Sequence, residues 1–543
     1  MKFSYDKHYV YLEGTPYHMK DEIKTKLNPT WVSNKKIKGW RFPNNVFSLR
    51  ELYKFFPELQ KNHDFVHLGK VARDEMQKWL YKKTPKIVQL YDNRLRGYQL
   101  DDVGYLVKRG SALVLNEPRT GKSPTIITVL KALGYKKNLV VCPSSLVFNW
   151  KKEFETWFPE CEVVAISGDK KKRVEQLKRY ALCVKHKVSV LVISKDTLKL
   201  EVNGQLKTSQ FDTMVVDEAH FLRNYKSQQS KAVFSVNAKV RYALTGTPAV
   251  KHAIDVYGLL HFIDKATYPS YWQFADRYFW ILEDMWGKSI GRAKEHREEE
   301  LTTLMQINSV QRKRKDVMKW LPEVTYQTIP VEMDSKQKKL YDQMLDTFVA
   351  GTDDLEIDAM NVLTQLIRLR QLCVDPRLLG FEYVGTKTKA MLEFAENNTD
   401  PFIVMTTFSS YFKILKPELE KLGKRVGVID GSISKKEKMD TAERFQRGEV
   451  DILLCNIIAA GTGFTLDKAD TVVFIDKDFN PANNEQAQDR IVPTTKERYH
   501  PINVISLVVA DSIDDSINSI LERKEDLTKI INKPEKLKSL VSS

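Results

Sequence analysis

The sequence predicts an α/β protein with two lobes, each a parallel sheet flanked by helices. Short β-branched apolar runs alternate with stretches of helical periodicity over residues 89–265 and again over 381–515. This alternation is typical of parallel strands joined by crossover helices. Residues 266–380 are charged and helical in periodicity, so we expect helical insertions between the lobes. Residues 1–88 are predicted to form a small basic α+β domain, and residues 516–543 a helical tail.

Length and composition exclude several classes of protein. The chain has 543 residues, of which 42% are hydrophobic and 29% charged, as in a folded protein rather than a disordered one. Its longest apolar runs fall short of the ~18 residues needed to cross a bilayer. The N-terminus has no apolar signal core, so we expect a cytoplasmic protein, or a nuclear one if the source is eukaryotic. The five cysteines are scattered without a CxxC pair, which argues against a structural zinc site.

The N-terminal domain carries a basic excess. Residues 1–90 hold 18 basic and 9 acidic side chains, in a chain whose net charge is +16. Cations beside aromatic rings can neutralise phosphates while the rings stack on bases. We therefore expect a DNA-recognition domain, or alternatively a solubilising surface around a domain whose aromatic residues form its own core. The residues concerned are Lys35, Lys36, Lys38, Trp31, Trp40 and Phe42.

A phosphate-binding loop is predicted between a strand and a helix. The apolar run SALVL precedes it, an apolar helical run follows it, and its residues are Asn116, Glu117, Pro118, Arg119, Thr120, Gly121, Lys122 and Ser123. In this setting backbone N–H groups at the helix start wrap the phosphates of ATP. Lys122 is expected to bridge the β and γ phosphates, and the Ser123 hydroxyl to bind Mg²⁺. Asn116 stands where the usual pattern has a glycine.

Two carboxylates are predicted to act with this loop. Asp217 and Glu218 follow the apolar strand TMVV within the same α/β unit, so they project from the carboxyl edge of the sheet. Asp217 is placed to hold Mg²⁺, and Glu218 is placed to polarise the water that attacks the γ-phosphate. The alternative is a chance acidic turn after a buried strand.

The ordered set of motifs resembles the Swi/Snf-like group of superfamily-two, DEAH-box, DNA-dependent ATPases, from about Leu95 to Asp515. This resemblance implies two RecA-like lobes and ATP hydrolysis coupled to double-stranded DNA. The element LRGYQ is similar to one whose glutamine reads the adenine, which implies that Gln99 contacts the nucleotide. The elements CPSSL with NW, SKDTL and LTGTP resemble segments that contact DNA or couple it to the nucleotide. They imply DNA contacts by Ser144, Ser145, Trp150, Ser194 and Thr245.

The resemblance continues through the second half of the chain. The segments RKRKDV with LP, and LIRLRQLC, are similar to segments specific to this group. The second-lobe pattern AAGTGF and its preceding strand imply a nucleotide contact by Gly461 and DNA contacts by Asn456 and Thr462. In the sixth motif the group has two arginines that reach the γ-phosphate, and here these positions hold Arg490 and Pro493.

The loss of one arginine leaves the rate of hydrolysis open. Arginine fingers supply about 10³–10⁵ in rate, so either Lys496 or Arg498 substitutes, or one arginine suffices, or hydrolysis is slow. The implied catalytic residues are Lys122, Asp217, Glu218 and Arg490.

The predicted function is a monomeric motor that moves on double-stranded DNA and remodels branched DNA. The segment KKIKGWRFP followed by SLRELYKFF is similar to the small recognition domain of annealing-type, fork-remodelling members of the group. Fork reversal or branch migration in replication, recombination or repair is therefore expected, with ATP and Mg²⁺ as cofactors and no membrane partner. Two alternatives remain: a weakly hydrolysing ATP-dependent clamp, and a motor that strips proteins from DNA.

Overall fold

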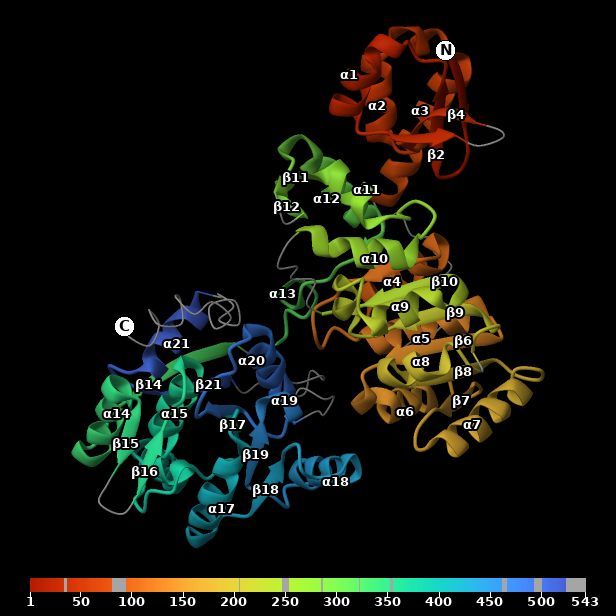
Figure 1. Ribbon diagram of the computed structural model, residues 1–543. Helices are drawn as coiled ribbons and strands as arrows, with labels where there is room; N and C mark the ends of the chain where they lie inside the picture. The colour runs from red at the N-terminus through yellow and green to blue at the C-terminus, as the bar shows by residue number, and fades with distance from the viewer. Residues whose placement is uncertain are drawn as a thin grey trace. The chain divides into compact units, whose positions relative to one another are not determined.

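The computed structural model describes residues 1–33, 37–80, 94–204, 206–246, 253–284, 287–321, 323–351, 355–460, 466–492 and 501–523. The chain divides into two compact units, Met1–Val317 and Met318–Ser543 (Figure 1). Each unit contains a parallel sheet flanked by helices, and an additional small antiparallel sheet lies at the N-terminus. The predicted fold class is confirmed. The division between the units falls inside the segment 266–380 that was expected to be inserted between the lobes.

The N-terminal domain is a four-stranded antiparallel sheet packed against helices (Figure 1, red). Its strands are β1 (Lys2–Tyr5), β2 (Tyr9–Glu13), β4 (Lys38–Pro43) and β3 (Thr30–Ser33), in sheet order. Its helices are α1 (Lys20–Leu27), α2 (Val46–Phe55) and α3 (His63–Leu80). Trp40 and Phe42 are buried in the core with Val10 and Leu52, whereas Trp31 is half exposed. Two of the three aromatic residues therefore belong to the core of the domain.

The first lobe is a sheet whose described strands run in the order β13-β5-β10-β9-β6-β8-β7, with parallel pairing throughout. Alternate residues of one strand enter opposite cores: Leu139 and Val141 of β6 pack on one face, and Val140 on the other. Because both faces are covered, the strands are almost continuously apolar. The strands are β5 (Ala112–Val114), β6 (Lys137–Cys142), β7 (Glu162–Ala165), β8 (Ser189–Ser194), β9 (Gln210–Val216), β10 (Asn237–Leu244) and β13 (Ser309–Val310).

Helices connect these strands as crossover elements, except α4, which precedes β5. The helices of the first lobe are α4 (Gly97–Arg109), α5 (Lys122–Leu133), α6 (Val147–Trp157), α7 (Lys170–Cys183), α8 (Lys195–Glu201), α9 (Gln228–Ser235) and α10 (Val256–Ile263). Several begin at side-chain caps that accept a hydrogen bond from a first-turn N–H, such as Asp169 of α7 and Ser227 of α9. Such caps satisfy donors that the helix itself leaves unpaired.

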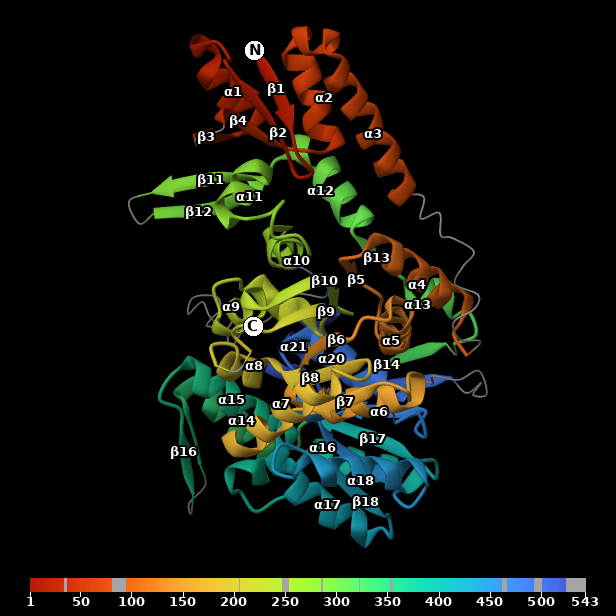
Figure 2. The same ribbon diagram turned by 90° about the vertical axis from the view of Figure 1, so that its right-hand side faces the viewer.

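An insertion follows α10 and contains both helices and a hairpin. It comprises α11 (Tyr271–Tyr278), the antiparallel strands β11 (Phe279–Asp284) and β12 (Gly287–Ala293), and α12 (Glu295–Ile307), followed by α13 (Arg314–Val317). Figure 2 shows the hairpin extending away from α11 and α12. The segment 266–380 was expected to be helical from its periodicity, so this hairpin was not predicted.

A buried ionic cluster joins this insertion to the N-terminal domain. Arg277 forms a bidentate pair with Glu300, with both N–O distances at 2.9 Å, and donates to the Ser48 hydroxyl at 2.8 Å. Arg297 pairs with Glu300 at 3.2 Å and with Glu51 of α2. Burial raises the pKa of Glu300, but the charges of Arg277 and Arg297 more than offset it and hold that pKa below its ordinary value.

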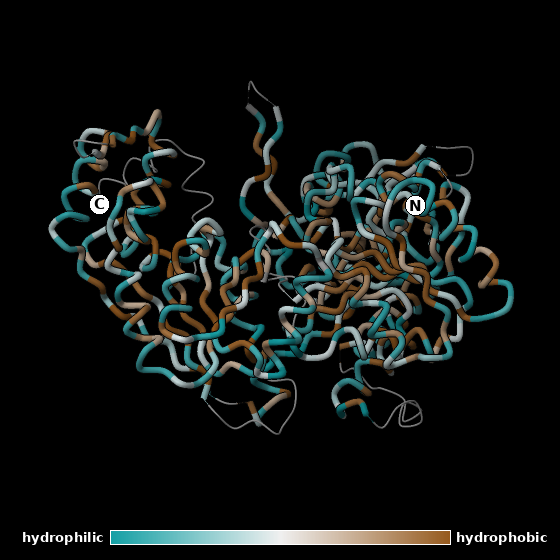
Figure 3. The backbone as a smooth tube through the Cα atoms, turned by 90° about the horizontal axis from the view of Figure 1, so that it is seen from below, coloured by the Kyte–Doolittle hydropathy of each residue, from teal (hydrophilic) through white to brown (hydrophobic). Residues whose placement is uncertain are grey.

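The second lobe is a parallel sheet in the order β14-β21-β20-β17-β19-β18. Its strands are β14 (Val324–Val331), β17 (Phe402–Thr406), β18 (Val426–Ile429), β19 (Ile452–Asn456), β20 (Thr471–Phe474) and β21 (Ile502–Val509). Its helices include α14 (Ser335–Thr347), α15 (Val362–Val374), α16 (Thr386–Asn397), α17 (Phe412–Lys421), α18 (Lys435–Gln446), α20 (Pro481–Gln488) and α21 (Ile513–Glu522). Figure 3 shows that apolar residues follow the central strands of each sheet.

Two further features of the described residues bear on the predicted partners. None of the described helices is both long and apolar enough to cross a membrane. Within the same ranges, His, Cys, Asp and Glu side chains do not gather in groups of three or more that could hold a metal ion.

Candidate nucleotide-binding site

Three neighbouring strands of the first lobe bring the predicted motifs to one edge of the sheet. β10 lies between β5 and β9, with Leu244 opposite Val114 and Ala243 opposite Val216. The residues that follow these strand ends are the phosphate loop, Thr245 with Gly246, and Asp217 with Glu218. Since the strands are parallel, their carboxyl ends meet, as open α/β sheets require of a ligand site.

The phosphate loop is tightly curved around the Lys122 side chain. Its Nζ donates to the carbonyl oxygens of Asn116 at 3.0 Å and Glu117 at 3.3 Å. Two loop residues adopt left-handed backbone conformations, Arg119 with φ 69° and Gly121 with φ 81°. Gly121 suits this conformation, and a Cβ atom there would lie 2.1 Å from Gln99 Nε2, so that Gln99 would have to shift. Loops of this kind turn backbone N–H groups toward an anion.

The first turn of α4 supports the phosphate loop at the point where the loop enters α5. The buried Gln99 accepts from the Arg96 N–H at 2.7 Å and donates to the carbonyls of Thr120 and Gly121 at 3.3 and 3.4 Å. Tyr98 donates its hydroxyl to the same Thr120 carbonyl at 2.8 Å. The resemblance assigns Gln99 to the adenine, and here its Nε2 end holds the loop while its Oε1 end accepts from the Arg96 N–H.

Asn116, the residue that departs from the usual glycine, has a structural role. Its Nδ2 donates to Asp102 Oδ2 at 2.9 Å, and the other Asp102 oxygen accepts from Arg312 Nε and Nη2 at 2.9 and 2.7 Å. Asn116 and Asp102 are buried. A series of side-chain hydrogen bonds from Arg312 through Asp102 to Asn116 therefore fixes the start of the phosphate loop.

Backbone contacts strengthen the same connection. The Glu117 N–H donates to the Arg312 carbonyl at 3.0 Å, and the Arg314 N–H donates to Glu117 Oε2 at 2.7 Å. The sequence motifs did not indicate Asp102 or Arg312 as site residues. Arg312 lies 210 positions after Asp102 in the sequence, so no local pattern could have indicated the contact between them.

The two carboxylates differ in their surroundings. Asp217 is buried, and its oxygens accept from Trp150 Nε1 and from the Glu218 N–H, each at 2.9 Å. Burial raises the pKa of Asp217 to about 6, the Glu218 charge adds to the rise, and the Trp150 hydrogen bond and the Lys122 charge oppose it. Glu218 is partly exposed with φ 48°, and its Oε2 lies 3.3 Å from His220 Nδ1.

The third strand end lies against the loop. A Cβ atom at Gly246 would lie 3.0 Å from the ring carbons of Pro118 and 3.1 Å from Lys122 Nζ. The LTGTP element thus contacts the phosphate loop closely enough that only glycine fits without a shift. Ser123 is the second residue of α5.

The remaining predicted nucleotide residues belong to the second unit. Arg490 lies in the short 3₁₀ helix η9 (Asp489–Ile491), directly after α20, and is partly buried. Its carbonyl accepts from the Leu466 N–H at 2.9 Å. Gly461 and Thr462 lie outside the described residues, as do Pro493, Lys496 and Arg498.

Three of the residues that are implied to contact DNA have buried side chains. Trp150 is 2% exposed and its indole holds Asp217. Ser194 is 4% exposed, and its hydroxyl caps α8 by accepting from the Thr197 N–H at 3.1 Å. Thr245 is completely buried. In this structure the Trp150 and Ser194 side chains position neighbouring elements, and the implied DNA contacts of all three residues stay predictions.

The other implied DNA contacts have more varied positions. Ser144 is exposed and Ser145 half-buried on η4 (Ser144–Leu146), and Lys38 is exposed at the start of β4. Asn456 donates to the Thr407 carbonyl at 3.0 Å and to the Ser409 hydroxyl at 3.1 Å, so its amide already orders the end of β19. Lys35 and Lys36 lie outside the described residues.

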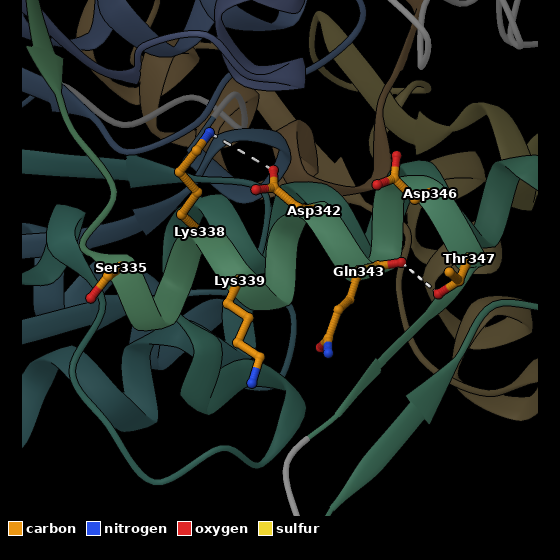
Figure 4. A pocket seen from close by; sticks show the side chains of 7 residues that line it. All are labelled: Ser335, Lys338, Lys339, Asp342, Gln343, Asp346 and Thr347. Carbon is orange, nitrogen blue, oxygen red and sulfur yellow. Dashed lines mark hydrogen bonds and ion pairs between the residues drawn. The ribbon is translucent and has the colours of Figure 1, made fainter.

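A shallow hollow in the second unit lies along a single helix. Figure 4 shows its side chains arranged along α14, where Lys338 lies 3.8 Å from Asp342 and the Thr347 hydroxyl donates to the Gln343 carbonyl at 2.7 Å. Pairs at this spacing are typical of a solvated helix face. We therefore assign it no part in nucleotide binding.

Comparison with family models decides the family. The model of the SNF2-related domain matches residues 36–378, which is more than half of the chain, and the helicase conserved C-terminal domain matches residues 386–492. The chain belongs to the SNF2-related family. The resemblance to the Swi/Snf-like group is thereby confirmed, and the SNF2-related chain is placed among helicase-type enzymes as the sequence predicts.

Relatives of this SNF2-related chain include helicases from distant organisms. It is 29% identical over 464 residues to a chromodomain-helicase-DNA-binding protein 1-like of Danio rerio, which covers 80% of this chain. It is 27% identical over 453 residues to an uncharacterized ATP-dependent helicase of Mycoplasma pneumoniae, again over 80% of this chain. The chain spans 43% and 42% of the lengths of these two relatives.

A solved structure also matches the SNF2-related chain. It is the SWI2/SNF2 ATPase core of Sulfolobus solfataricus in complex with double-stranded DNA, with 21% sequence identity and a TM-score of 0.40. The match covers 84% of this chain and 99% of the other.

Proposed function

We propose that this SNF2-related chain is a monomeric, ATP-dependent translocase on double-stranded DNA that remodels branched DNA in replication, recombination or repair. The observation that supports ATP hydrolysis most directly is the convergence of the phosphate loop, the Asp217–Glu218 pair and Gly246 at one sheet edge. Relatives named as helicases support the same reaction.

The residues at this edge suit ATP and Mg²⁺. Lys122 donates to two loop carbonyls, and phosphate oxygens would replace these acceptors. Ser123 and Asp217 would hold Mg²⁺, which when bound withdraws electron density from the phosphate oxygens. The raised pKa of buried Asp217 fits this role, because a carboxylate that is costly to ionise alone gains from a nearby cation.

The residues of this site are proposed to have separate catalytic and positioning roles. Glu218 orients the attacking water and accepts its proton, while Trp150 and the Glu218 N–H fix the Asp217 carboxylate. Gly246 touches the loop at Lys122, so a change at the phosphates is passed to the end of β10. Arg490 is proposed to supply positive charge to the γ-phosphate in the transition state.

DNA binding is proposed to depend on the phosphate backbone and therefore to fall steeply with salt. The N-terminal domain is proposed to recognise branched DNA through the exposed side of its sheet edge. Trp31 on edge strand β3 is half exposed beside the exposed Lys38 of β4, a combination that suits a base next to a phosphate.

Steady-state ATP hydrolysis tests the proposal. Hydrolysis is measured without DNA and with single strands, duplex or a four-way junction, for the wild type and for Lys122→Ala and Arg490→Ala. We expect stimulation of at least about tenfold by duplex or junction, lost in both variants. Tight DNA binding with negligible hydrolysis would instead favour the clamp. Faster displacement of a bound protein than remodelling of the junction would favour a protein-stripping motor.

A further inference from the structure

We propose that a surface groove in the first unit binds the unpaired strand of a branched nucleic acid. This inference rests on the proposed function, since it names the part of the DNA that the groove contacts. The groove has a volume of about 520 Å³ and lies between the segment after Glu218 and the α11–β12 insertion. We call it the aromatic groove and define it by Arg223, Tyr225, Lys226, Tyr271, Trp272 and Lys288.

The aromatic side chains form a rigid stack with an exposed end. The rings of Tyr225 and Tyr271 are stacked, with centroids 4.3 Å apart and planes at 17°. Tyr257 meets both of them edge-on, at 5.5 and 5.3 Å. Trp272 lies edge-on to Tyr271 at 5.5 Å and is 40% exposed. An indole held in place by neighbouring rings offers a flat face on which a base can stack.

The groove is also positively charged. Its lining contains the cations Arg223, Lys226 and Lys288 and the acid Asp255. Lys288 pairs with Glu283 of the neighbouring strand. Arg223 and Lys226 are exposed, and among the described residues neither forms an ion pair. These two cations are therefore available to neutralise phosphates.

Together the rings and cations favour an unpaired strand over other occupants. The bases of a duplex are stacked on one another, so a duplex would offer this groove only its phosphates. An acidic peptide would likewise use the cations and leave the Trp272 ring without a matching partner. A single strand supplies both a phosphate and a free base face at each nucleotide.

The groove is continuous with the catalytic segment. Arg223 is the last residue of η5 (Ala219–Arg223), which begins directly after Glu218. Gly258 of α10 packs against this segment so closely that a Cβ atom would lie 2.0 Å from the Leu222 carbonyl oxygen. A strand held by Arg223 would therefore contact the short helix that directly follows Glu218.

The hairpin that forms one wall supplies matched controls. Ile281 and Ile290 pack on the lobe core, and Figure 2 shows the strands extending from it. Trp280 and Leu282 occupy the alternate positions of β11, so they lie on the other face of the hairpin, 50% and 57% exposed. Trp280 is thus an exposed indole outside the groove. Arg292 of β12 is an exposed arginine that does not line it.

Fluorescence anisotropy with a labelled short oligothymidylate, and separately with a blunt duplex, tests the proposal over a series of salt concentrations. Trp272→Ala should weaken oligothymidylate binding roughly 5- to 150-fold, which is the effect of losing one stacked base. The double variant Arg223→Ala, Lys226→Ala should lower the salt slope by about 1.4, or about 0.7 for each phosphate contact. Duplex binding should be unchanged in both.

The controls separate the groove from a general effect on the protein. Trp280→Ala and Arg292→Ala should bind oligothymidylate as the wild type does, and Trp272→Phe should keep most of the affinity because it keeps a ring. Wild-type binding by Trp272→Ala and by the double variant would overturn the proposal. Equal weakening in Trp280→Ala and Trp272→Ala would overturn it as well.

Photocrosslinking of the unchanged protein gives a test that needs no variant. An oligothymidylate carrying a photoreactive base should crosslink to the peptide that contains Trp272, and crosslinking confined to other peptides would contradict the proposal. The proposed function fails separately, if the wild type shows no DNA-stimulated ATP hydrolysis. Oligothymidylate binding can be measured in either case, so the two failures are distinguishable.

Discussion

At the scale of single residues, the Trp150 indole explains how the buried Asp217 carboxylate is stabilised in its charged form. Its N–H donates to Asp217 Oδ2 at 2.9 Å and favours the charged form of a group whose burial favours the neutral one. The same side chain resembles a DNA-contacting tryptophan in sequence. In this structure Trp150 is 2% exposed and its indole holds the Asp217 carboxylate.

Trp150→Phe should shift the acid limb of the pH–rate profile for ATP hydrolysis to higher pH. The variant keeps a ring in the core but removes the donor that lowers the pKa of Asp217, so a larger fraction of the carboxylate is protonated at a given pH. DNA binding should not change. Trp157→Phe, on the same helix, is the control and should leave the profile in place. A profile unchanged in Trp150→Phe would show that this hydrogen bond does not tune Asp217.

Asp217 also predicts a pH dependence of stability. Its pKa is about 6 in the folded protein and about 3.9 in an unfolded chain, so between these values the folded protein binds more protons. Stability therefore falls as pH rises from about 4 to about 6, by roughly 2–3 kcal/mol for this one group. Urea unfolding of wild type and Asp217→Asn at several pH values isolates this contribution.

The wild-type free energy of unfolding, minus that of Asp217→Asn, should decline across this window and level off above it. Taking this difference cancels the contributions of the other titrating groups. The hydrogen bond that asparagine cannot accept adds a cost that does not vary with pH, so it does not alter the decline. A difference that does not vary with pH would contradict the assignment. The measurement is made without nucleotide or Mg²⁺, since a cation would offset the cost of ionisation.

At the scale of elements, the start of the phosphate loop is held by a residue that lies far along the chain. Arg312 pairs with buried Asp102, which holds Asn116. Asn116 stands where the usual pattern has a glycine. The hydrogen bonds of this network fix the conformation of the loop at this position, which a glycine would reach through its backbone flexibility. The segment 312–314 also precedes the boundary between the two units.

Arg312→Ala should destabilise the first unit by about 3–5 kcal/mol, because Asp102 would remain buried without its ionic partner. It should also weaken nucleotide binding through disorder of the loop. Asp102→Asn with Arg312→Gln replaces the ion pair by neutral amides and should recover part of the stability. Chemical denaturation and nucleotide titration measure both effects. Normal nucleotide affinity in folded Arg312→Ala would show that the network supports the fold alone.

At the scale of the whole molecule, the N-terminal domain is part of the first unit rather than a separate attachment. Glu51 and Ser48 of α2 contact Arg297 and Arg277 in the insertion. Removing residues 1–85 would leave buried guanidinium groups with fewer partners. Point substitutions on the exposed sheet edge therefore test DNA recognition more cleanly than truncation.

The double variant Trp31→Ala, Lys38→Ala should reduce the preference for a four-way junction over duplex while leaving ATP hydrolysis without DNA unchanged. The loss of a stacking ring and of a cation predicts roughly tenfold weaker junction binding. Competition binding with labelled junction and unlabelled duplex measures the preference. A preference equal to that of the wild type would remove the recognition role of this domain. Lys70→Ala, an exposed lysine of α3, is the matched control.

The local patterns of the sequence were sufficient to predict the fold class and to name candidate residues of the nucleotide site. Parallel strands buried on both faces leave continuous apolar runs, and a strand–loop–helix element keeps its phosphate ligands within eight consecutive residues, 116–123. Asp217 and Glu218 could be named because they directly follow their strand, and Lys122 because it ends the loop between a strand and a helix.

Tertiary structure decided the features that depend on residues distant in sequence. It buried Trp150, Ser194 and Thr245, linked Arg312 to Asp102, and brought Arg223 beside Trp272. Exposure and long-range pairing depend on how the crossover helices and the insertion pack, and no short segment contains that information. The sequence by itself thus determined which chemistry this chain carries, while packing decided which side chains reach solvent to use it.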